Sequence, residues 1–134
     1  MQPIPVSGIP ARGAGGDAGR VNERVLVVDD QDVVRDVIRL TLEGAGYTVL
    51  VAATPLEAIA IACSAGPIDL LVTDVVMPQM DAFELADRII REVPGVRVLY
   101  TSGYTDAGAE GPFIQKPFTP AELVEMVGSV LAAV

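Results

Sequence analysis

Short runs of consecutive apolar residues alternate along this chain with longer segments in which apolar residues recur every three or four positions. The run Val25–Val28 is continuously apolar, as in a strand that is covered on both faces of a sheet. Helical spacing is found next, over residues 32–43. The apolar stripe of this predicted helix consists of Val33, Val34, Val37, Ile38 and Thr41. Gly44 and Gly46 then end the helix.

The same alternation continues through the rest of the chain. It predicts further strands at residues 47–52, 68–73, 96–101 and 112–115. It predicts further helices at residues 55–65 and 81–93 and from residue 119 onward, each opened by a capping residue. The expected inward positions are Phe83, Leu85, Ala86, Ile89 and Ile90, then Leu123, Val124, Met126, Val127, Val130 and Leu131, with Cys63 in or near the core. Strands that alternate with helices favour a parallel sheet covered on both faces.

Residues 1–23 differ in composition from the rest of the chain. They are rich in Gly, Ala and Pro and contain no apolar segment of the kind found in a secretory signal. Such a segment buries too little surface to offset the entropy lost on ordering. We therefore expect a flexible tail or linker at 1–23 and one folded domain at 24–134.

Composition narrows the range of functions. The 134 residues include 51% apolar residues, enough for one buried core, but no run that is long enough to cross a membrane. The net charge of −9 repels nucleic acid, so direct binding to it is not expected. A single cysteine allows no internal disulfide, which is compatible with a cytoplasmic protein. The absence of histidine excludes histidine-based catalysis by this chain.

Polar residues stand at the ends of the predicted strands. Asp29 and Asp30 end the first strand, Asp74 ends the third, and Lys116 comes directly after the last. The carboxyl ends of parallel strands share one edge, where ligands of such sheets bind. Clustered carboxylates need a cation, and oxygen ligands select a hard one such as Mg²⁺. The alternative for each acid is a solvated strand end or a helix cap.

Four motifs in this order resemble the receiver domain of bacterial two-component response regulators. They are Val27-Val28-Asp29-Asp30, Thr73-Asp74-Val75-Val76-Met77-Pro78-Gln79-Met80-Asp81, Ser102-Gly103-Tyr104 and Lys116-Pro117-Phe118. The resemblance covers residues 24–134 and is compatible with a single-domain regulator or with the receiver of a hybrid sensor histidine kinase. It implies a flavodoxin-like, doubly wound, five-stranded parallel sheet of order 2-1-3-4-5.

The resemblance also implies the chemistry of the site. Asp74 matches the phosphoacceptor, which takes a phosphoryl group from a phosphohistidine of a sensor histidine kinase or a histidine phosphotransfer protein. Asp29, Asp30, Asp74 and the backbone carbonyl of Val76 match the ligands of Mg²⁺. Such a domain is not an enzyme in the usual sense, since it catalyses only its own phosphorylation and dephosphorylation.

Three further positions match residues that bind the phosphoryl group or respond to it. Lys116 matches the family's lysine, and Phe113 matches its aromatic switch position. Ser102 matches the switch hydroxyl because the small Gly103 comes next, and Thr101 is the second candidate.

The sequence departs from the family between Ser102 and Lys116, which are separated by fewer residues than is usual. We therefore expect the fourth helix of the family's fold to be short or missing. Val76 and Tyr104 occupy the two positions that the resemblance links to phosphoryl lifetime. Neither carries an amide or a carboxylate that would orient water, so the resemblance implies slow self-dephosphorylation.

Other functions fit the residues less well. A phosphohydrolase of the haloacid dehalogenase type needs an aspartate two residues after the nucleophile, where this chain has Val76. A flavodoxin-like electron carrier would need a phosphate-binding loop after Val28. A receiver-like interaction domain that is never phosphorylated would have no need of the complete set of site residues. The oligomeric state, the partner kinase and the output target stay open.

Overall fold

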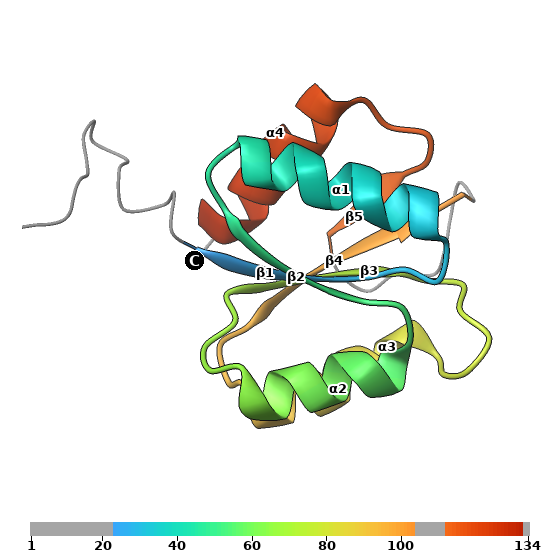
Figure 1. Cartoon of the computed structure of the whole chain (residues 1–134), viewed down its shortest axis with the longest axis vertical. Coiled ribbons are helices and arrows are strands. Elements are labelled where there is room, and N and C mark those ends of the chain that lie inside the picture. Colours follow the sequence, from blue (N-terminus) through green and yellow to red (C-terminus); the bar gives the residue numbers. More distant parts are fainter. Residues whose placement is uncertain (1–22, 104–111, 133–134) are drawn as a thin grey trace, which may run out of the picture.

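The computed structural model describes residues 23–103 and 112–132, which form a five-stranded parallel sheet between two layers of helices (Figure 1). The strands are β1 (Arg24–Val28), β2 (Thr48–Ala52), β3 (Leu70–Asp74), β4 (Arg97–Ser102) and β5 (Phe113–Gln115). The helices are α1 (Asp32–Gly44), α2 (Pro55–Ser64), α3 (Ala82–Glu92) and α4 (Pro120–Ala132). Each element lies within a few residues of its predicted range.

The strand order is β2-β1-β3-β4-β5, as predicted. Every neighbouring pair is parallel, and the register sets Val28 of β1 opposite Thr73 of β3 and Asp74 opposite Thr101 of β4. The carboxyl ends of β1, β3 and β4 therefore finish at about the same level of the sheet. This alignment brings the polar residues after those strands to one edge.

Each face of the sheet has its own core. Figure 1 shows α1 and α4 on one side of the sheet and α2 and α3 on the other. Alternate residues of one strand enter different cores, so that Val27 packs with Ile38 and Val127, whereas Leu26 packs with Leu85 and Ile89. Burial on both faces explains why the strands are continuously apolar in sequence.

Helix caps account for several of the boundaries. Thr54 Oγ1 accepts a hydrogen bond from Glu57 N at 3.1 Å, while Glu57 Oε1 accepts one from Ala53 N at 2.8 Å. Thr119 and Glu122 form the predicted capping box at the start of α4, with distances of 3.1 and 2.9 Å. These bonds satisfy backbone groups that a helix leaves unpaired at its first turn.

Several predicted core positions lie outside the core. In α1, Val33 and Val37 are exposed, at 75% and 48%, and the buried residues are Ile38 and Leu42. Ile90 of α3 is also exposed. Cys63 is exposed as well, because α2 buries the face that carries Ala58 and Ala62, and the next position is rotated about 100° from it.

Two arginines at the edge where the strands begin, opposite the polar edge, form hydrogen bonds to the ends of helices. Arg24 donates from its guanidinium to the carbonyls of Ala65 and Pro67, just after α2. Arg97 donates to the carbonyls of Val130 and Leu131 at the end of α4. Both side chains satisfy carbonyls at or near a helix C-terminus, where a positive charge is favourable.

The predicted departure from the family falls between β4 and β5. The part of the chain that the structure describes contains four helices, which fits a fourth family helix that is short or missing. Residues 104–111 and the expected tail through residue 22 lie outside the described residues. Within the described ranges, no helix is both long and apolar enough to cross a membrane.

Candidate functional site

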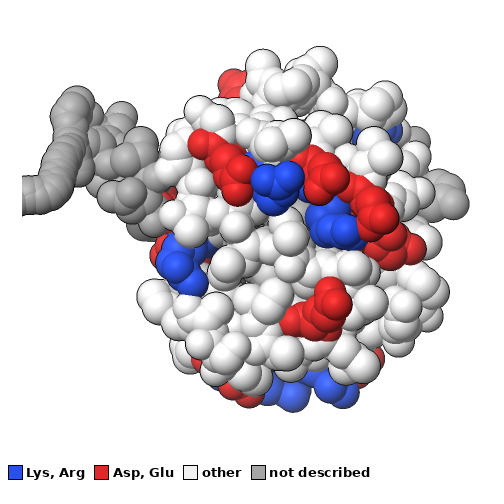
Figure 2. All heavy atoms as spheres, viewed as in Figure 1, with Lys and Arg blue, Asp and Glu red and all other residues white. Residues whose placement is uncertain are grey.

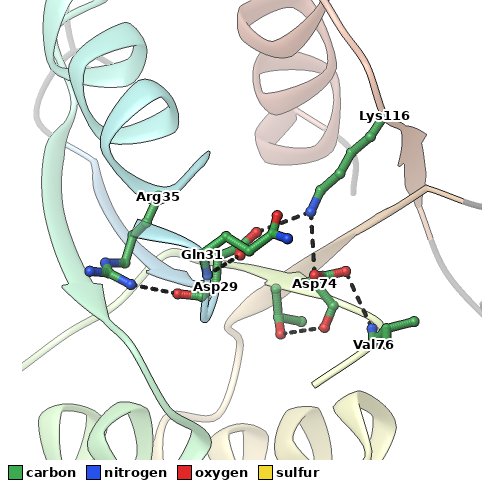
Figure 3. A network of polar contacts seen from close by, with 7 residues as sticks. Asp29, Gln31, Arg35, Asp74, Val76 and Lys116 are labelled. Atoms are coloured by element: carbon green, nitrogen blue, oxygen red, sulfur yellow. Dashed lines mark hydrogen bonds and ion pairs between the residues drawn. The ribbon is translucent and has the colours of Figure 1, made fainter. Parts of the chain in front are cut away.

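Lys116 joins the ends of two strands through their carboxylates. Its Nζ lies 3.2 Å from Asp29 Oδ2, after β1, and 3.3 Å from Asp74 Oδ2, at the end of β3 (Figure 3). The side chains of Asp29 and Asp74 are 1% and 10% exposed, and that of Lys116 is 19% exposed. The sequence prediction that these three groups converge at one edge is confirmed.

The environment of Asp29 is unfavourable to its charge. Burial raises the pKa of this carboxyl above the usual aspartate value, and the nearby negative charge of Asp74 adds to the rise. The backbone N–H of Gln31, which donates to Asp29 Oδ1 at 2.9 Å, and the ammonium of Lys116 offset part of this effect. A further cation beside Asp29 would therefore stabilise its ionised form.

Three carboxylates form a group that fits a hard cation. Oxygen atoms of Asp29, Asp30 and Asp74 all lie within 4.8 Å of one another, and Asp30 is exposed to solvent. An oxygen-only set that is open on one side suits Mg²⁺, which keeps several of its waters. Val76 is held next to this group, since its N–H donates to Asp74 Oδ1 at 3.3 Å.

A solvent-open cavity of about 590 Å³ is lined by two of these carboxylates, Asp30 and Asp74. Its lining includes Asp30, Asp74 and Lys116 together with the apolar or small residues Val76, Met77, Pro78 and Gly103. Gln31 also lines the cavity. Figure 3 shows its side chain directed toward Lys116 and Asp74. Gln31 could not be recognised from the sequence, because the position directly after an acidic pair carries no signal of its own.

Arg35 is a second residue that sequence reasoning missed. Its guanidinium donates to the backbone carbonyl of Asp29 at 2.7 Å and pairs with Asp32, which fixes the connection from β1 to α1. It belongs to a series of alternating charges along α1, which continues with Arg39 between Asp36 and Glu43. Figure 2 shows this series as a band of red and blue side chains across one face of the molecule. From sequence alone, a charged residue in the first turns of a helix is interpreted as exposed to solvent, so these contacts of Arg35 could not be predicted.

The candidate switch residues lie at the ends of β4 and β5. Ser102 is fully buried, and its carbonyl accepts a hydrogen bond from Lys116 N at 2.6 Å. Thr101 is also buried, and its Oγ1 has no hydrogen-bond partner among the described residues. Phe113 pairs in register with Tyr100 and packs in the core beneath α2 and α3. Tyr104 lies outside the described residues.

Comparison with known proteins places this arrangement among signalling domains. The sequence profile of the response regulator receiver domain matches residues 25–128. The chain is 35% identical over 116 residues to the sensor kinase CckA of Brucella abortus, covering 80% of this chain and 12% of that protein. It is 30% identical to the response regulator receiver protein CpdR of the same organism, covering 83% of this chain and 98% of CpdR.

Solved structures agree with the sequence comparison. The crystal structure of the receiver domain from the hybrid histidine kinase CckA superposes with a TM-score of 0.73 at 38% identity, covering 81% of this chain and 98% of that one. The chemotaxis protein CheY4 of Vibrio cholerae also gives a TM-score of 0.73, at 31% identity, covering 81% of this chain and 98% of CheY4. Among the curated relatives, the chain spans only 12% of CckA and 24% of the NtrC regulator of Rhizobium meliloti.

Proposed function

Because this chain belongs to the response regulator receiver domain family of two-component signalling, we propose that Asp74 accepts a phosphoryl group from a partner's phosphohistidine. The observation that carries the proposal is the position of the Asp74 carboxylate, at the end of β3, on the solvent-open cavity and 3.3 Å from the Lys116 ammonium. The chain contains no histidine, so the donor imidazole belongs to a sensor histidine kinase or a histidine phosphotransfer protein.

The transfer is a displacement at phosphorus. An oxygen of Asp74 forms a bond to phosphorus as the phosphorus–nitrogen bond of the partner breaks, and the electron pair remains on the imidazole nitrogen. Lys116, already between Asp29 and Asp74, donates hydrogen bonds to the incoming phosphoryl oxygens. When Mg²⁺ is bound by Asp29, Asp30, Asp74 and the carbonyl of Val76, it offsets the negative charge of the phosphoryl oxygens.

We assign the response to phosphorylation to Ser102 and Phe113. The Ser102 hydroxyl donates a hydrogen bond to one phosphoryl oxygen on Asp74, and the Lys116 ammonium donates to another. The backbone N–H of Lys116 already donates to the Ser102 carbonyl. Movement of Ser102 toward the phosphoryl group leaves space that Phe113 occupies, which changes the surface beside β5. Thr101 is the competing hydroxyl, and separate alanine variants of the two residues distinguish them.

An apolar groove beside the acidic cavity supports the assignment of a protein partner. Val33 and Val37 of α1 line it together with Pro117 and Phe118, and Lys116 borders both the groove and the cavity. Exposed apolar patches of this kind are typical of protein interaction sites. A partner that docks along α1 brings its phosphohistidine to the mouth of the cavity. We place this exchange in the cytoplasm, which a chain with one cysteine permits.

The proposal is tested by phosphorylation of the protein with phosphoramidate and Mg²⁺. We expect one acid-stable, base-labile phosphoryl group in the wild type, none in Asp74→Asn, and an unchanged amount in Asp87→Asn, a matched change at an exposed position of α3. Backbone NMR shifts with beryllofluoride should move around Asp74 and Ser102. Labelling that persists in Asp74→Asn would contradict the assignment.

The lifetime of the phosphoryl group stays a prediction. Val76 is 56% exposed on the wall of the cavity and carries no polar side-chain atom. We therefore expect self-dephosphorylation to be slower than in receivers that have an amide or a carboxylate at this position and at the position of Tyr104.

A further inference from the structure

Gln31 is the neutral polar side chain on the wall of the acidic cavity. The other lining residues in the described part of the chain are charged, namely Asp30, Asp74 and Lys116, or lack a polar side-chain atom. Gln31 is exposed to solvent and directly precedes the first turn of α1. Water can therefore reach the part of the cavity wall that Gln31 forms.

Hydrogen bonds hold the backbone of Gln31 in place, while its side chain can still bind a molecule in the cavity. Its N–H donates to Asp29 Oδ1 at 2.9 Å, and its carbonyl accepts from Arg35 N, also at 2.9 Å. Gln31 stands at the N-cap position of α1, but its side chain makes no capping hydrogen bond. Figure 3 shows the side chain lying along the cavity toward Lys116 and Asp74. The two backbone bonds hold the residue in place, so its amide can bond to a molecule in the cavity.

We propose that the Gln31 amide positions the water that hydrolyses the phosphoryl group on Asp74, an inference that rests on the proposed function. The water oxygen forms a bond to phosphorus as the bond from phosphorus to the Asp74 oxygen breaks, which regenerates the carboxylate and releases inorganic phosphate. The proton of the water passes to the phosphate or to solvent. In-line attack requires water on the side of phosphorus away from Asp74, and that water must come from the solvent-open cavity that Gln31 lines.

A primary amide suits this role because its oxygen is a hydrogen-bond acceptor. That oxygen accepts a hydrogen bond from the attacking water, which directs a lone pair of the water toward phosphorus. An amide is not a base, so the contribution is one of orientation. Val76 supplies no such group from the connection after β3, which leaves Gln31 to supply it just before α1.

The test compares Gln31→Met with Gln79→Met. Methionine removes the amide at similar length, and Gln79 is an exposed glutamine that does not line the cavity. Each protein is phosphorylated with phosphoramidate, the donor is removed, and loss of the label is monitored over time. We expect hydrolysis about fivefold slower in Gln31→Met, as for the loss of one hydrogen bond, and unchanged in Gln79→Met.

A second readout separates orientation of water from damage to the site. Beryllofluoride mimics the bound phosphoryl group without undergoing hydrolysis, so its affinity, measured by ¹⁹F NMR titration, should be the same in wild type and Gln31→Met. Unchanged hydrolysis in Gln31→Met, or a parallel loss of beryllofluoride affinity, would overturn the inference and leave the proposed function intact. A wild-type protein that takes no label would overturn both.

Discussion

Removal of the Lys116 charge should destabilise the metal-free protein by about 2–3 kcal/mol at pH 7. The ammonium lies 3.2 and 3.3 Å from two nearly buried carboxylates, and Lys116→Met leaves both without an ion-pair partner among the described residues. At an effective dielectric constant of about 20, each such pair contributes about 5 kcal/mol of direct attraction, most of which desolvation offsets. Loss of one partner from a fully buried pair costs about 3–5 kcal/mol. The 19% exposure of Lys116 places this site at or just below the lower end of that range.

The assay is thermal unfolding monitored by circular dichroism, first with a chelator and then with Mg²⁺. For a domain of this size, about 4 °C in Tm corresponds to 1 kcal/mol, so we expect Lys116→Met to unfold about 10 °C below wild type. Arg88→Met is the control. It removes an exposed ion pair with Glu84 and should cost at most about 0.5 kcal/mol. Mg²⁺ should raise the Tm of Lys116→Met more than that of wild type, because it replaces the missing positive charge.

The difference between the two proteins should also depend on pH. Burial raises the pKa of Asp29, so its native form binds a proton more readily than the unfolded chain does. Stability contributed by this group is therefore lost as the pH rises from about 4 through the raised native pKa. Without Lys116 that pKa rises further. The gap in Tm between wild type and Lys116→Met should narrow as the pH falls from 7 toward 4.

Two results would refute this reasoning. The first is a metal-free Tm for Lys116→Met as close to wild type as that of Arg88→Met, which would mean that the buried carboxylates do not need the ammonium. The second is an equal effect of Mg²⁺ on wild type and on Lys116→Met, which would place the cation away from Asp29 and Asp74.

Three further outcomes test the site. Asp29→Ala should weaken Mg²⁺ binding about tenfold or more in calorimetric titration, and equal affinity would place the metal elsewhere. Lys116→Arg should fail to restore the beryllofluoride-induced NMR shifts at Phe113, because a planar guanidinium does not replace a compact ammonium; a normal response would exclude this explanation. Val76→Asn should shorten the phosphoryl lifetime about fivefold when label decay is measured, and an unchanged lifetime would show that residue 76 does not control hydrolysis.

The fold and the centre of the site were predictable because both depend on strand periodicity. A strand buried on both faces gives a continuous apolar run, and its end is marked by the first charged residue. Asp29, Asp74 and Lys116 each stand at or just after such an end. Parallel pairing then brings them to one edge, so their convergence needed no knowledge of helix orientation.

The features that sequence reasoning missed depend on how each helix rests on the sheet. In α1, an apolar stripe drawn through Val33 and Val37 is as regular as one drawn through Ile38 and Leu42, and only the second faces the core. The same ambiguity misplaced Cys63. Gln31 contributes to the cavity through the direction of one side chain at a helix start, which no spacing rule describes.

Arg24 and Arg97 lie at the edge of the sheet opposite the reactive groups, and this separation is useful for attaching a probe. Arg24 and Arg97 hold helix ends at one pole, while the reactive groups occupy the other. A fluorophore or a surface tether attached near Gly95, in the connection that enters β4, would therefore report on the domain without obstructing access to Asp74. With a probe or tether at this site, binding and release of a partner could be measured on single molecules.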